Sequence, residues 1–356
     1  MKNFTHNGVL LLIGLIIISP SFSQTFIPFQ KYFGDTERDV AYSIERLTDT
    51  SFLVGGTTKL NSATPADGLV FEVNLSGDVR NLHRIDQGNR EDTRRAIPLP
   101  GGNMIAIGNT TDAGIGVNRD DLGMVKFDNS GTVINSQFLG NRTDDDQLHL
   151  GMLTRDNHVL IGGVSADGPS VAKGIISKMD TSGNVVWAVE ASTGPDRDDC
   201  QAATEANRGY YVVGGSNYRS GSDRNPSLYY VDQSGNLIFS KVYNDGSSNN
   251  NSAYSYRRAV QHINDNSILF AEGISRGGSD YDILLINVDS TGAVKWAKAY
   301  GNNGVQAPNF IRKANDGNIL VGGLTGTTSG GLELDALVFK IDTAGSVIWA
   351  RAYGNE

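Results

Sequence analysis

Short apolar segments separated by polar turns run along the chain after its first two dozen residues. Some alternate apolar and polar residues, as in ALVFKID at 336–342, and others are short apolar runs, as in ILVGG at 319–323. Alternation with a period of two is typical of a half-buried β-strand, and a short apolar run between turn residues is typical of a buried one. Sustained helical periodicity is absent from the sequence. The pattern therefore predicts an all-β protein with many short strands.

One turn sequence, Asp/Asn-x-Ser/Thr/Ala-Gly, recurs six times at spacings of 54, 52, 52, 57 and 53 residues. Apolar runs that end in small residues, such as FLVGG and YVVGG, recur in step with it. Two sequences that recur together at one period indicate a structural repeat. The six turn copies are NLSG at 74–77, DNSG at 128–131, DTSG at 180–183, DQSG at 232–235, DSTG at 289–292 and DTAG at 342–345.

Each repeat predicts four antiparallel strands, which in the last copy lie at 309–314, 319–323, 336–342 and 346–354. A four-stranded sheet cannot bury both faces alone, whereas sheets stacked face to face around an axis bury one another. We therefore expect a six-bladed β-propeller of four-stranded antiparallel blades. A seven-bladed or incompletely closed propeller is the alternative, and a linear β-solenoid is disfavoured because its usual repeat is much shorter.

The expected propeller is a single domain over residues 24–356. Residues 25–34, which include FIPFQKYFG, form an extra outer strand, because they share an aromatic–Gly ending with SVIWARAYG at 346–354. In a closed ring one of these two copies completes the last blade, and the other lies beside it or stays loose. The repeat units span 35–86, 87–140, 141–191, 192–243, 244–300 and 301–354.

The segments DALVFKIDTAGSVIWARAYG and DILLINVDSTGAVKWAKAYG resemble exported bacterial β-propeller repeats of the type usually described as seven-bladed. The resemblance implies the propeller fold and export, and little about activity. A weaker likeness is to quinoprotein propellers, which also place a Trp after an Asp-x-x-Gly turn. Here Trp187, Trp296 and Trp349 share their position with Phe239 in another repeat. We expect this position to pack an aromatic ring against the neighbouring blade rather than to bind a quinone.

The N-terminus predicts export. Lys2 precedes an apolar run from Gly8 to Ile18, and Ser21 and Ser23 are the small residues of a cleavage site. Residues 1–23 therefore read as a signal peptide cleaved after Ser23, because the apolar run is shorter than the roughly 20 residues that span a bilayer. We expect a secreted, periplasmic or cell-surface protein of a bacterium, without a membrane span.

Charge and cysteine content narrow the partners. The net charge is −9, which disfavours nucleic acid because binding to phosphates depends on Lys and Arg. Cys200 is the only cysteine, so the chain forms no internal disulfide, and we expect Cys200 to be a small buried residue. We expect a monomer that binds an extracellular protein or glycan.

Long, variable connections lie between the second and third strands and between repeats, and function concentrates in such loops. Basic pairs near first strands predict an anion site at the mouth of a central channel: Arg94, Arg95, Arg257, Arg258, Arg312 and Lys313. In the acidic loop NRTDDDQ, Asp144, Asp145 and Asp146 are the candidate ligands for Ca²⁺, which prefers oxygen ligands. These loops also contain Arg residues, so local charge pairing is the default and a bound Ca²⁺ is the alternative; no other cofactor is expected.

Two functions follow from the sequence. The favoured one is a secreted, non-catalytic binding or scaffold module that recognises protein or glycan through its loop-bearing face. The alternative is an enzyme, a hydrolase or lyase with its site at the mouth of the central channel. The histidines beyond the leader fall at unrelated positions within their repeats, so the sequence identifies no catalytic residue.

Overall fold

The computed structural model describes residues 9–11, 31–34, 38–59, 65–86, 90–111, 120–139, 145–166, 172–193, 198–216, 225–243, 259–277, 280–326 and 334–354. Every regular element in these ranges is a β-strand, which confirms the all-β class. Within the same ranges no helix is long and apolar enough to cross a membrane.

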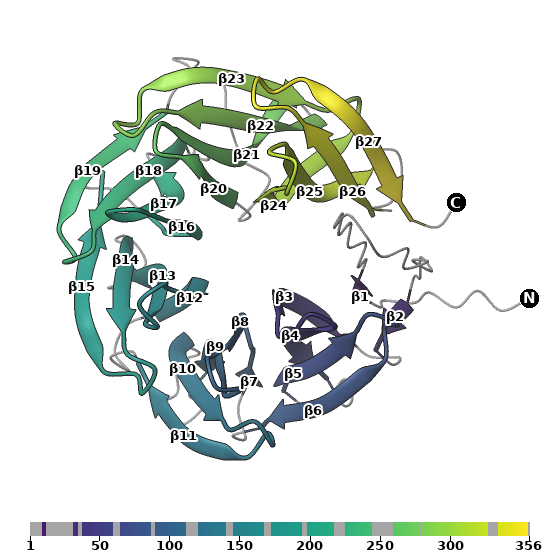
Figure 1. The fold of residues 1–356 in the computed structure, drawn as a ribbon, viewed down its shortest axis with the longest axis vertical. Coiled ribbons are helices and arrows are strands. Elements are labelled where there is room, and N and C mark those ends of the chain that lie inside the picture. Colours follow the sequence, from purple (N-terminus) through teal and green to yellow (C-terminus); the bar gives the residue numbers. More distant parts are fainter. Residues whose placement is uncertain are drawn as a thin grey trace, which may run out of the picture. The chain divides into compact units, whose positions relative to one another are not determined.

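The described strands form six consecutive antiparallel meanders, which we number as sheets 1 to 6 (Figure 1). In sheet 2 the first strand is broken into two pieces that both pair with β9. Sheets 5 and 6 are joined by one parallel bridge between Tyr281 and Val305. Sheet 1 contains β3 (Val40–Arg46), β4 (Ser51–Thr58), β5 (Asp67–Asn74) and β6 (Val79–Ile85); sheet 2 contains β7 (Arg90–Glu91), β8 (Arg95–Pro98), β9 (Met104–Thr111), β10 (Asp120–Phe127) and β11 (Val133–Phe138); sheet 3 contains β12 (Asp145–Leu153), β13 (Val159–Ala166), β14 (Ala172–Met179) and β15 (Val185–Ala191); sheet 4 contains β16 (Ala202–Ala206), β17 (Gly209–Ser216), β18 (Asn225–Asp232) and β19 (Leu237–Val242); sheet 5 contains β20 (Ala259–Asn264), β21 (Ser267–Gly277), β22 (Asp280–Val288) and β23 (Val294–Tyr300); sheet 6 contains β24 (Val305–Lys313), β25 (Ile319–Gly326), β26 (Leu334–Ile341) and β27 (Val347–Tyr353).

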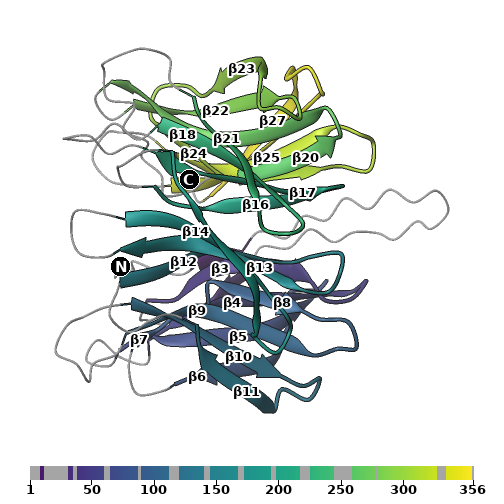
Figure 2. The ribbon, with the colours of Figure 1, turned by 90° about the vertical axis from the view of Figure 1, so that its left-hand side faces the viewer.

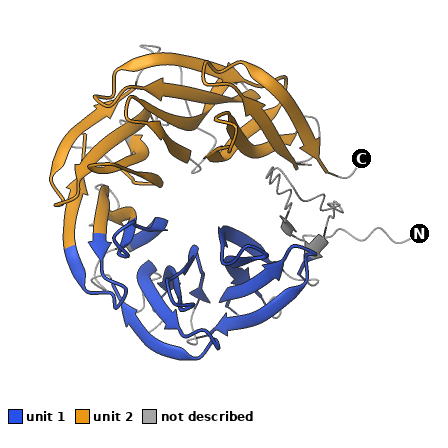
Figure 3. Cartoon of the chain, in the orientation of Figure 1, with its two compact units in different colours: residues 1–161, 178–186 blue, residues 162–177, 187–356 orange. Residues whose placement is uncertain are grey.

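The chain divides into two compact units, residues 1–161 with 178–186 and residues 162–177 with 187–356 (Figure 3). The boundary falls inside sheet 3. Sheets 1 and 2 belong to the first unit, and sheets 4, 5 and 6 belong to the second. Each unit is described by itself below.

Tight turns join the first strand to the second and the third strand to the fourth in each meander, and both turns leave the sheet at the same end (Figure 2). The repeated Asp explains the second turn. In sheet 4, Asp232 Oδ1 accepts hydrogen bonds from the backbone N–H groups of Ser234 and Asn236, both at 2.9 Å. Gly235 adopts φ 88°, a value that glycine reaches without steric cost. The turn sequence thus fixes where each third strand ends.

Apolar layers lie between consecutive sheets of the first unit. Leu53 and Val70 of sheet 1 pack with Ala106, Val125 and Phe127 of sheet 2. Sheet 2 also packs against sheet 3. Ile105 in β9 and Leu148 in β12 are buried in the same apolar cluster. Burial of such side chains is worth about 1.5–3 kcal/mol each, so these layers are the main source of stability.

The second unit repeats this arrangement. Tyr211 and Leu228 of sheet 4 pack with Phe270 and Ile286 of sheet 5. The opposite face of sheet 5 packs against Ile319, Val321, Phe339 and Ile341 of sheet 6. Cys200 lies in the described part of this unit, unpaired and fully buried, as the sequence predicts.

The fourth strands extend to the next sheet through their aromatic positions. Trp187 Nε1 in β15 donates a hydrogen bond to the carbonyl of Gln233, in the turn of sheet 4, at 3.1 Å. Trp296 and Tyr300 in β23 pack against the apolar layer shared by sheets 5 and 6. The prediction that this Trp position packs against the neighbouring sheet is therefore confirmed for Trp187 and Trp296.

The N-terminal segment forms a separate two-stranded element. β2 (Lys31–Phe33) pairs antiparallel with β1 (Val9–Leu11), which lies inside the expected leader. β27 pairs with β26 along its whole length and completes sheet 6. Of the two copies of the outer strand, the C-terminal one therefore serves as the fourth strand of the last sheet.

Candidate functional site

In the first unit, the first strands of sheets 1 and 2 begin where the connections between repeats arrive, and this end holds a polar cluster. Asp92 precedes β8 and is buried. Its Oδ1 accepts a hydrogen bond from the backbone N–H of Asn109 at 2.9 Å, and its Oδ2 accepts one from Arg94 Nε at 3.0 Å. Burial raises the pKa of Asp92, against the opposing effect of Arg94.

Arg94, one of the predicted anion-binding residues, lies across an aromatic ring. Its guanidinium carbon is 4.4 Å from the ring centroid of Tyr42, within the range of a cation–π contact. The side chain is 30% exposed, and among the described residues its terminal nitrogens have no hydrogen-bond partner. Arg94 therefore presents a fixed, solvent-accessible cation.

Arg95, its predicted companion, is engaged inside the protein. It donates hydrogen bonds to the carbonyl oxygens of Tyr42 at 3.4 Å, Arg94 at 2.9 Å and His149 at 2.8 Å. These contacts tie the first strands of three sheets together. Arg95 is thus a structural cross-link, and the basic pair presents one accessible cation instead of two.

Of the four remaining basic residues predicted to bind an anion, two lie in the described part of the chain and two lie outside it. Arg312 and Lys313 lie on β24 of the second unit and are exposed. Lys313 Nζ donates to the carbonyl of Ile263 at 3.0 Å, and Arg312 donates to the carbonyl of Ile311 at 3.0 Å. Arg257 and Arg258 lie outside the described residues.

Of the predicted Ca²⁺ ligands, only Asp146 has a described side chain. Asp144 lies outside the described residues, and Asp145 is the first residue of β12. Asp146 is buried, and its Oδ1 has no hydrogen-bond partner in the described part of the chain. One carboxylate does not make a calcium site, which needs six to eight oxygen ligands. The Ca²⁺ site therefore stays a prediction.

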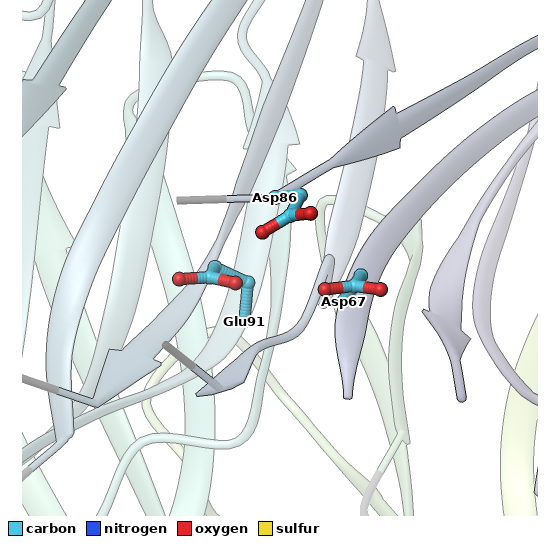
Figure 4. A group of neighbouring side chains, drawn as sticks. All are labelled: Asp67, Asp86 and Glu91. Carbon is cyan, nitrogen blue, oxygen red and sulfur yellow. The ribbon is translucent and has the colours of Figure 1, made fainter. Parts of the chain in front are cut away.

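A different acidic cluster escaped the sequence analysis. Carboxylate oxygens of Asp67, Asp86 and Glu91 lie within 4.8 Å of one another, in the first unit (Figure 4). Asp67 and Glu91 are buried and Asp86 is exposed. They come from the start of β5, the residue after β6 and the end of β7, and the acids do not recur together in the other repeats. Without a repeated signal, only the fold brings them together.

Arg84 is the counter-charge of this cluster. Its Nε is 2.5 Å from Asp67 Oδ2, and its Nη2 is 3.1 Å from Asp86 Oδ2. The hydrogen bond to Asp67 is the main reason that the pKa of Arg84 is raised. The three carboxylates have the right chemistry for a hard cation. However, Arg84 already occupies two of them, so an ion-pair network accounts for the arrangement.

A small cavity lies next to both groups. Its volume is about 30 Å³, and it is lined by Ile85, Glu91, Asp92, Asn109 and Thr110 among others. A cavity of this size holds about one water molecule. It has no room for a sugar or a peptide side chain, so the raised pKa of Asp92 does not belong to a substrate pocket at this point.

The second unit contains a related cluster at the start of sheet 4. Asp198 accepts hydrogen bonds from the backbone N–H of Thr193 at 2.7 Å and from its hydroxyl at 3.0 Å. Asp199 accepts hydrogen bonds from the N–H of Gly215 and from Gln201 Nε2, the latter at 2.7 Å. Asp199 and Gln201 thus repeat the pairing of Asp92 and Arg94, with a neutral amide in place of the guanidinium.

Buried thiol and phenol groups beside this cluster are unreactive. Burial raises the pKa of the Cys200 thiol well above its ordinary value, and nearby Asp199 and Asp198 act in the same direction. Burial also raises the pKa of Tyr229, whose hydroxyl accepts a hydrogen bond from Ser227 at 3.1 Å. Neither group is accessible, so this cluster has a structural role.

No family model and no curated protein matches the chain. Solved structures do match. A protein of unknown function from Dyadobacter fermentans is 8% identical, with a TM-score of 0.53 over 85% of this chain and 95% of that one. The α-L-arabinanase of Penicillium chrysogenum, solved with arabinobiose, is 12% identical, with a TM-score of 0.52 over 84% and 92%. A protein of unknown function from Bacteroides caccae is 11% identical, with a TM-score of 0.50 over 85% and 94%. These likenesses show the fold alone.

Proposed function

We propose that the chain is an exported, non-catalytic binding module that recognises a carboxylate-bearing protein or glycan. The observation that carries this proposal is the Tyr42–Arg94 pair, in which an aromatic ring holds an accessible guanidinium. A guanidinium fixed in this way is preorganised to bind a carboxylate through two parallel hydrogen bonds. The pair lies at the end of the sheets where the connections between repeats arrive, and such loops usually carry function.

We propose further that the six meanders are the blades of one six-bladed propeller within residues 24–356. The even spacing of the six turn sequences and the recurring contact between each fourth strand and the next sheet in its unit support this arrangement. Small-angle scattering of the exported chain is the test. A compact disc is expected, and a profile of two separately tumbling bodies would contradict a closed ring.

The binding test uses the chain from Gln24 and a panel of acidic and neutral glycans and peptides. The informative variant is Arg94→Gln, because Gln201 at the corresponding position of sheet 4 donates a hydrogen bond to Asp199. We expect about tenfold weaker binding of the acidic ligand, since a charge-assisted bond is replaced by a neutral one.

The matched control is Arg46→Gln, which removes an exposed cation paired with Asp49 on the same sheet as Tyr42. It should leave the affinity unchanged. Equal binding by Arg94→Gln and the parent chain, or a panel in which only neutral ligands bind, would refute the proposed recognition.

The second candidate is a hydrolase or lyase, and the raised pKa of Asp92 is the observation in its favour. Both oxygens of Asp92 are hydrogen-bonded, and the adjoining cavity of about 30 Å³ is too small for a substrate, so we rank it second. Turnover of an acidic glycan that is abolished by Asp92→Asn would favour the enzyme over the binding module.

A further inference from the structure

The last residue of a fourth strand, or the residue just after it, packs against the next sheet in both units. In the second unit, Tyr243 lies 5.2 Å from Phe270, and Tyr300 lies 5.3 Å from Phe339, measured between ring centroids. Both tyrosines are partly buried against the apolar layer of the following sheet. In the first unit, Ile85 and Leu139 hold this position and pack in the same way.

The receiving surface occupies the same three positions in sheets 2, 5 and 6. In sheet 6 it consists of Val321 in β25 with Phe339 and Ile341 in β26. Val321 and Phe339 are directly paired across the two strands. Because these positions recur with the repeat, the apolar surface is built by the repeat itself and does not depend on which neighbouring sheet covers it.

Sheet 1 has this surface too. It consists of Val54 in β4 with Phe71 and Val73 in β5, and Val54 is paired with Phe71. Counted from the turn residues Asn74 and Asp342, Phe71 and Val73 match Phe339 and Ile341. Among the described residues no four-stranded sheet precedes sheet 1 along the chain, so no preceding repeat supplies a fourth strand to this surface.

Phe33 fills this surface. Its ring lies 5.9 Å from that of Phe71 at an interplanar angle of 42°, and it packs against the cluster of Val54, Phe71 and Val73. The tilted pair of Tyr300 and Phe339 has a similar angle of 33°. Phe33 is followed by Gly34, as Tyr300 is followed by Gly301. Sequence and contact therefore agree that Phe33 is equivalent to Tyr300.

We propose that Val54, Phe71 and Val73 form a docking site for the aromatic end of an outer strand, and that Phe33, at the end of β2, fills it in the exported chain as a clasp on sheet 1. The strand partner of β2 is β1, inside the expected leader. Phe33 itself contacts sheet 1 directly, through its ring contact with Phe71 and its packing against Val54 and Val73. Phe33 should therefore remain docked after residues 1–23 are removed.

The first test measures hydrogen exchange in the chain from Gln24 and in its Phe33→Ala and Phe33→Tyr variants. Loss of the ring should speed exchange in β5 about tenfold, since local opening is governed by the contacts that cover a strand. Phe33→Tyr should keep the parent protection, because Tyr is the residue used in sheets 4 and 5. The control is Phe138→Ala, which removes a phenylalanine ring that is 47% exposed on β11.

The second test supplies the segment from outside. The peptide FIPFQKYFG, residues 26–34, should bind the Phe33→Ala chain saturably and restore protection of β5. The same peptide with alanine in place of its Phe33 should not. If Phe33→Ala folds poorly, Phe33→Leu serves instead, because Leu139, the residue just after β11, holds the equivalent position in sheet 2.

Parent-like exchange and thermal stability in Phe33→Ala would overturn the proposal, as would equal restoration by both peptides. These outcomes are separate from those of the ligand test, because the docking site and the Tyr42–Arg94 pair share no residue. Parent-like exchange in Phe33→Ala, together with capture of an acidic ligand that depends on Arg94, would overturn the clasp and leave the binding proposal intact.

Discussion

Two glycines that face each other in sheet 2 differ sharply in what surrounds them. Gly108 and Gly123 are paired across β9 and β10. A Cβ on Gly108 would lie 1.6 Å from the carbonyl oxygen of Asp92, whereas the nearest atom to a Cβ on Gly123 is Thr110 Cγ2 at 3.6 Å. Gly108 therefore permits the close approach of the first strand that brings Asp92 to its hydrogen-bond partners.

We expect Gly108→Ala to lower the free energy of unfolding by about 1–3 kcal/mol, because the backbone must move to admit the methyl group. Gly123→Ala is the matched control and should change it by much less, since its neighbours are at ordinary contact distance. Urea unfolding of both variants is the measurement. Equal destabilisation would mean that the close approach at Gly108 is unimportant.

The turn aspartates make a contribution to stability that depends on pH. Asp289 accepts hydrogen bonds from the hydroxyl and N–H of Thr291, both at 2.8 Å, and from the N–H of Ala293 at 2.9 Å. These bonds, led by the Thr291 hydroxyl, lower the pKa of Asp289 below its ordinary 3.8. Stability from a lowered carboxyl pKa is present above the ordinary value and is lost as the pH falls through the folded value.

The Asp289→Asn variant should keep nearly the parent melting temperature at neutral pH, because Asn74 already makes this turn in sheet 1 with bonds from the N–H groups of Ser76 and Asp78. It should lose less stability than the parent as the pH falls below the ordinary carboxyl pKa of 3.8. Melting curves above and below that pH check this. Parallel losses in both chains would show that this turn does not contribute to acid unfolding.

At this scale the sequence predicts a residue when its role repeats. The turn aspartates, Cys200 and Trp187 were placed correctly because each is read from a repeat pattern or from composition. The cluster of Asp67, Asp86 and Glu91 was not, since its members are contributed by two successive repeats and the three acids do not recur together in another repeat. The basic pair of Arg94 and Arg95 was recognised, yet the sequence could not show that Arg95 donates hydrogen bonds to three backbone carbonyls.

Among the elements, the fourth strands do more than close their own sheets. In β23, Tyr300 donates a hydrogen bond to the carbonyl of Gly345 at 2.7 Å, in the turn of sheet 6. Lys298 Nζ donates to the carbonyl of Ala344 at 2.8 Å in the same turn. A Cβ on Gly345 would meet the Tyr300 hydroxyl at 2.8 Å and Trp296 at 3.1 Å. The turn glycine is therefore enclosed by the strand of the preceding sheet.

Tyr300→Phe should cost about 0.5–1.5 kcal/mol of unfolding free energy, the usual net value of one hydrogen bond. The ring contact with Phe339 remains, so a larger loss is not expected. Tyr230→Phe is the control, because among the described residues the Tyr230 hydroxyl donates no hydrogen bond while its ring is packed in the same manner. Chemical denaturation of the two variants should separate the hydroxyl from the ring.

The strand pattern of the last repeat was predicted closely, with one exception. Strands expected at 319–323, 336–342 and 346–354 correspond to β25, β26 and β27. The first strand was expected from residue 309, but β24 begins at Val305. The ladder has a bulge between Pro308 and Phe310, and Gln306 is buried with side-chain hydrogen bonds to Asn302 and Thr325. A proline, a polar residue and a bulge break the alternation that sequence analysis relies on.

For the molecule as a whole, the leader gives a direct prediction. When the full chain is expressed in a bacterium, the exported protein should begin at Gln24, because Ser21 and Ser23 provide the small residues that the processing enzyme requires. Intact mass and N-terminal sequencing of the exported fraction measure this. Substitution of Ser23 by a bulky residue such as Trp should leave the leader attached. Export of an uncleaved parent chain would contradict the prediction.

The number of meanders followed from the sequence because each period contains one Asp-type turn and one apolar run. The different structural roles of the N-terminal and C-terminal strand copies did not follow from the sequence. FIPFQKYFG and SVIWARAYG look alike as strands, and only the fold shows that β27 pairs with β26 while Phe33 covers sheet 1. Similar sequences compete for similar places, and the choice depends on contacts that are distant along the chain.

Among the described residues of each unit, the fourth strands contact the apolar layer of the following sheet. In a chain built from such contacts, the stability is approximately a sum of one contribution per sheet and one per neighbouring pair. Damage to one sheet should therefore weaken the two beside it and fade beyond them. Hydrogen exchange after destabilising substitutions in successive sheets should then show opening that extends over one neighbouring repeat at a time.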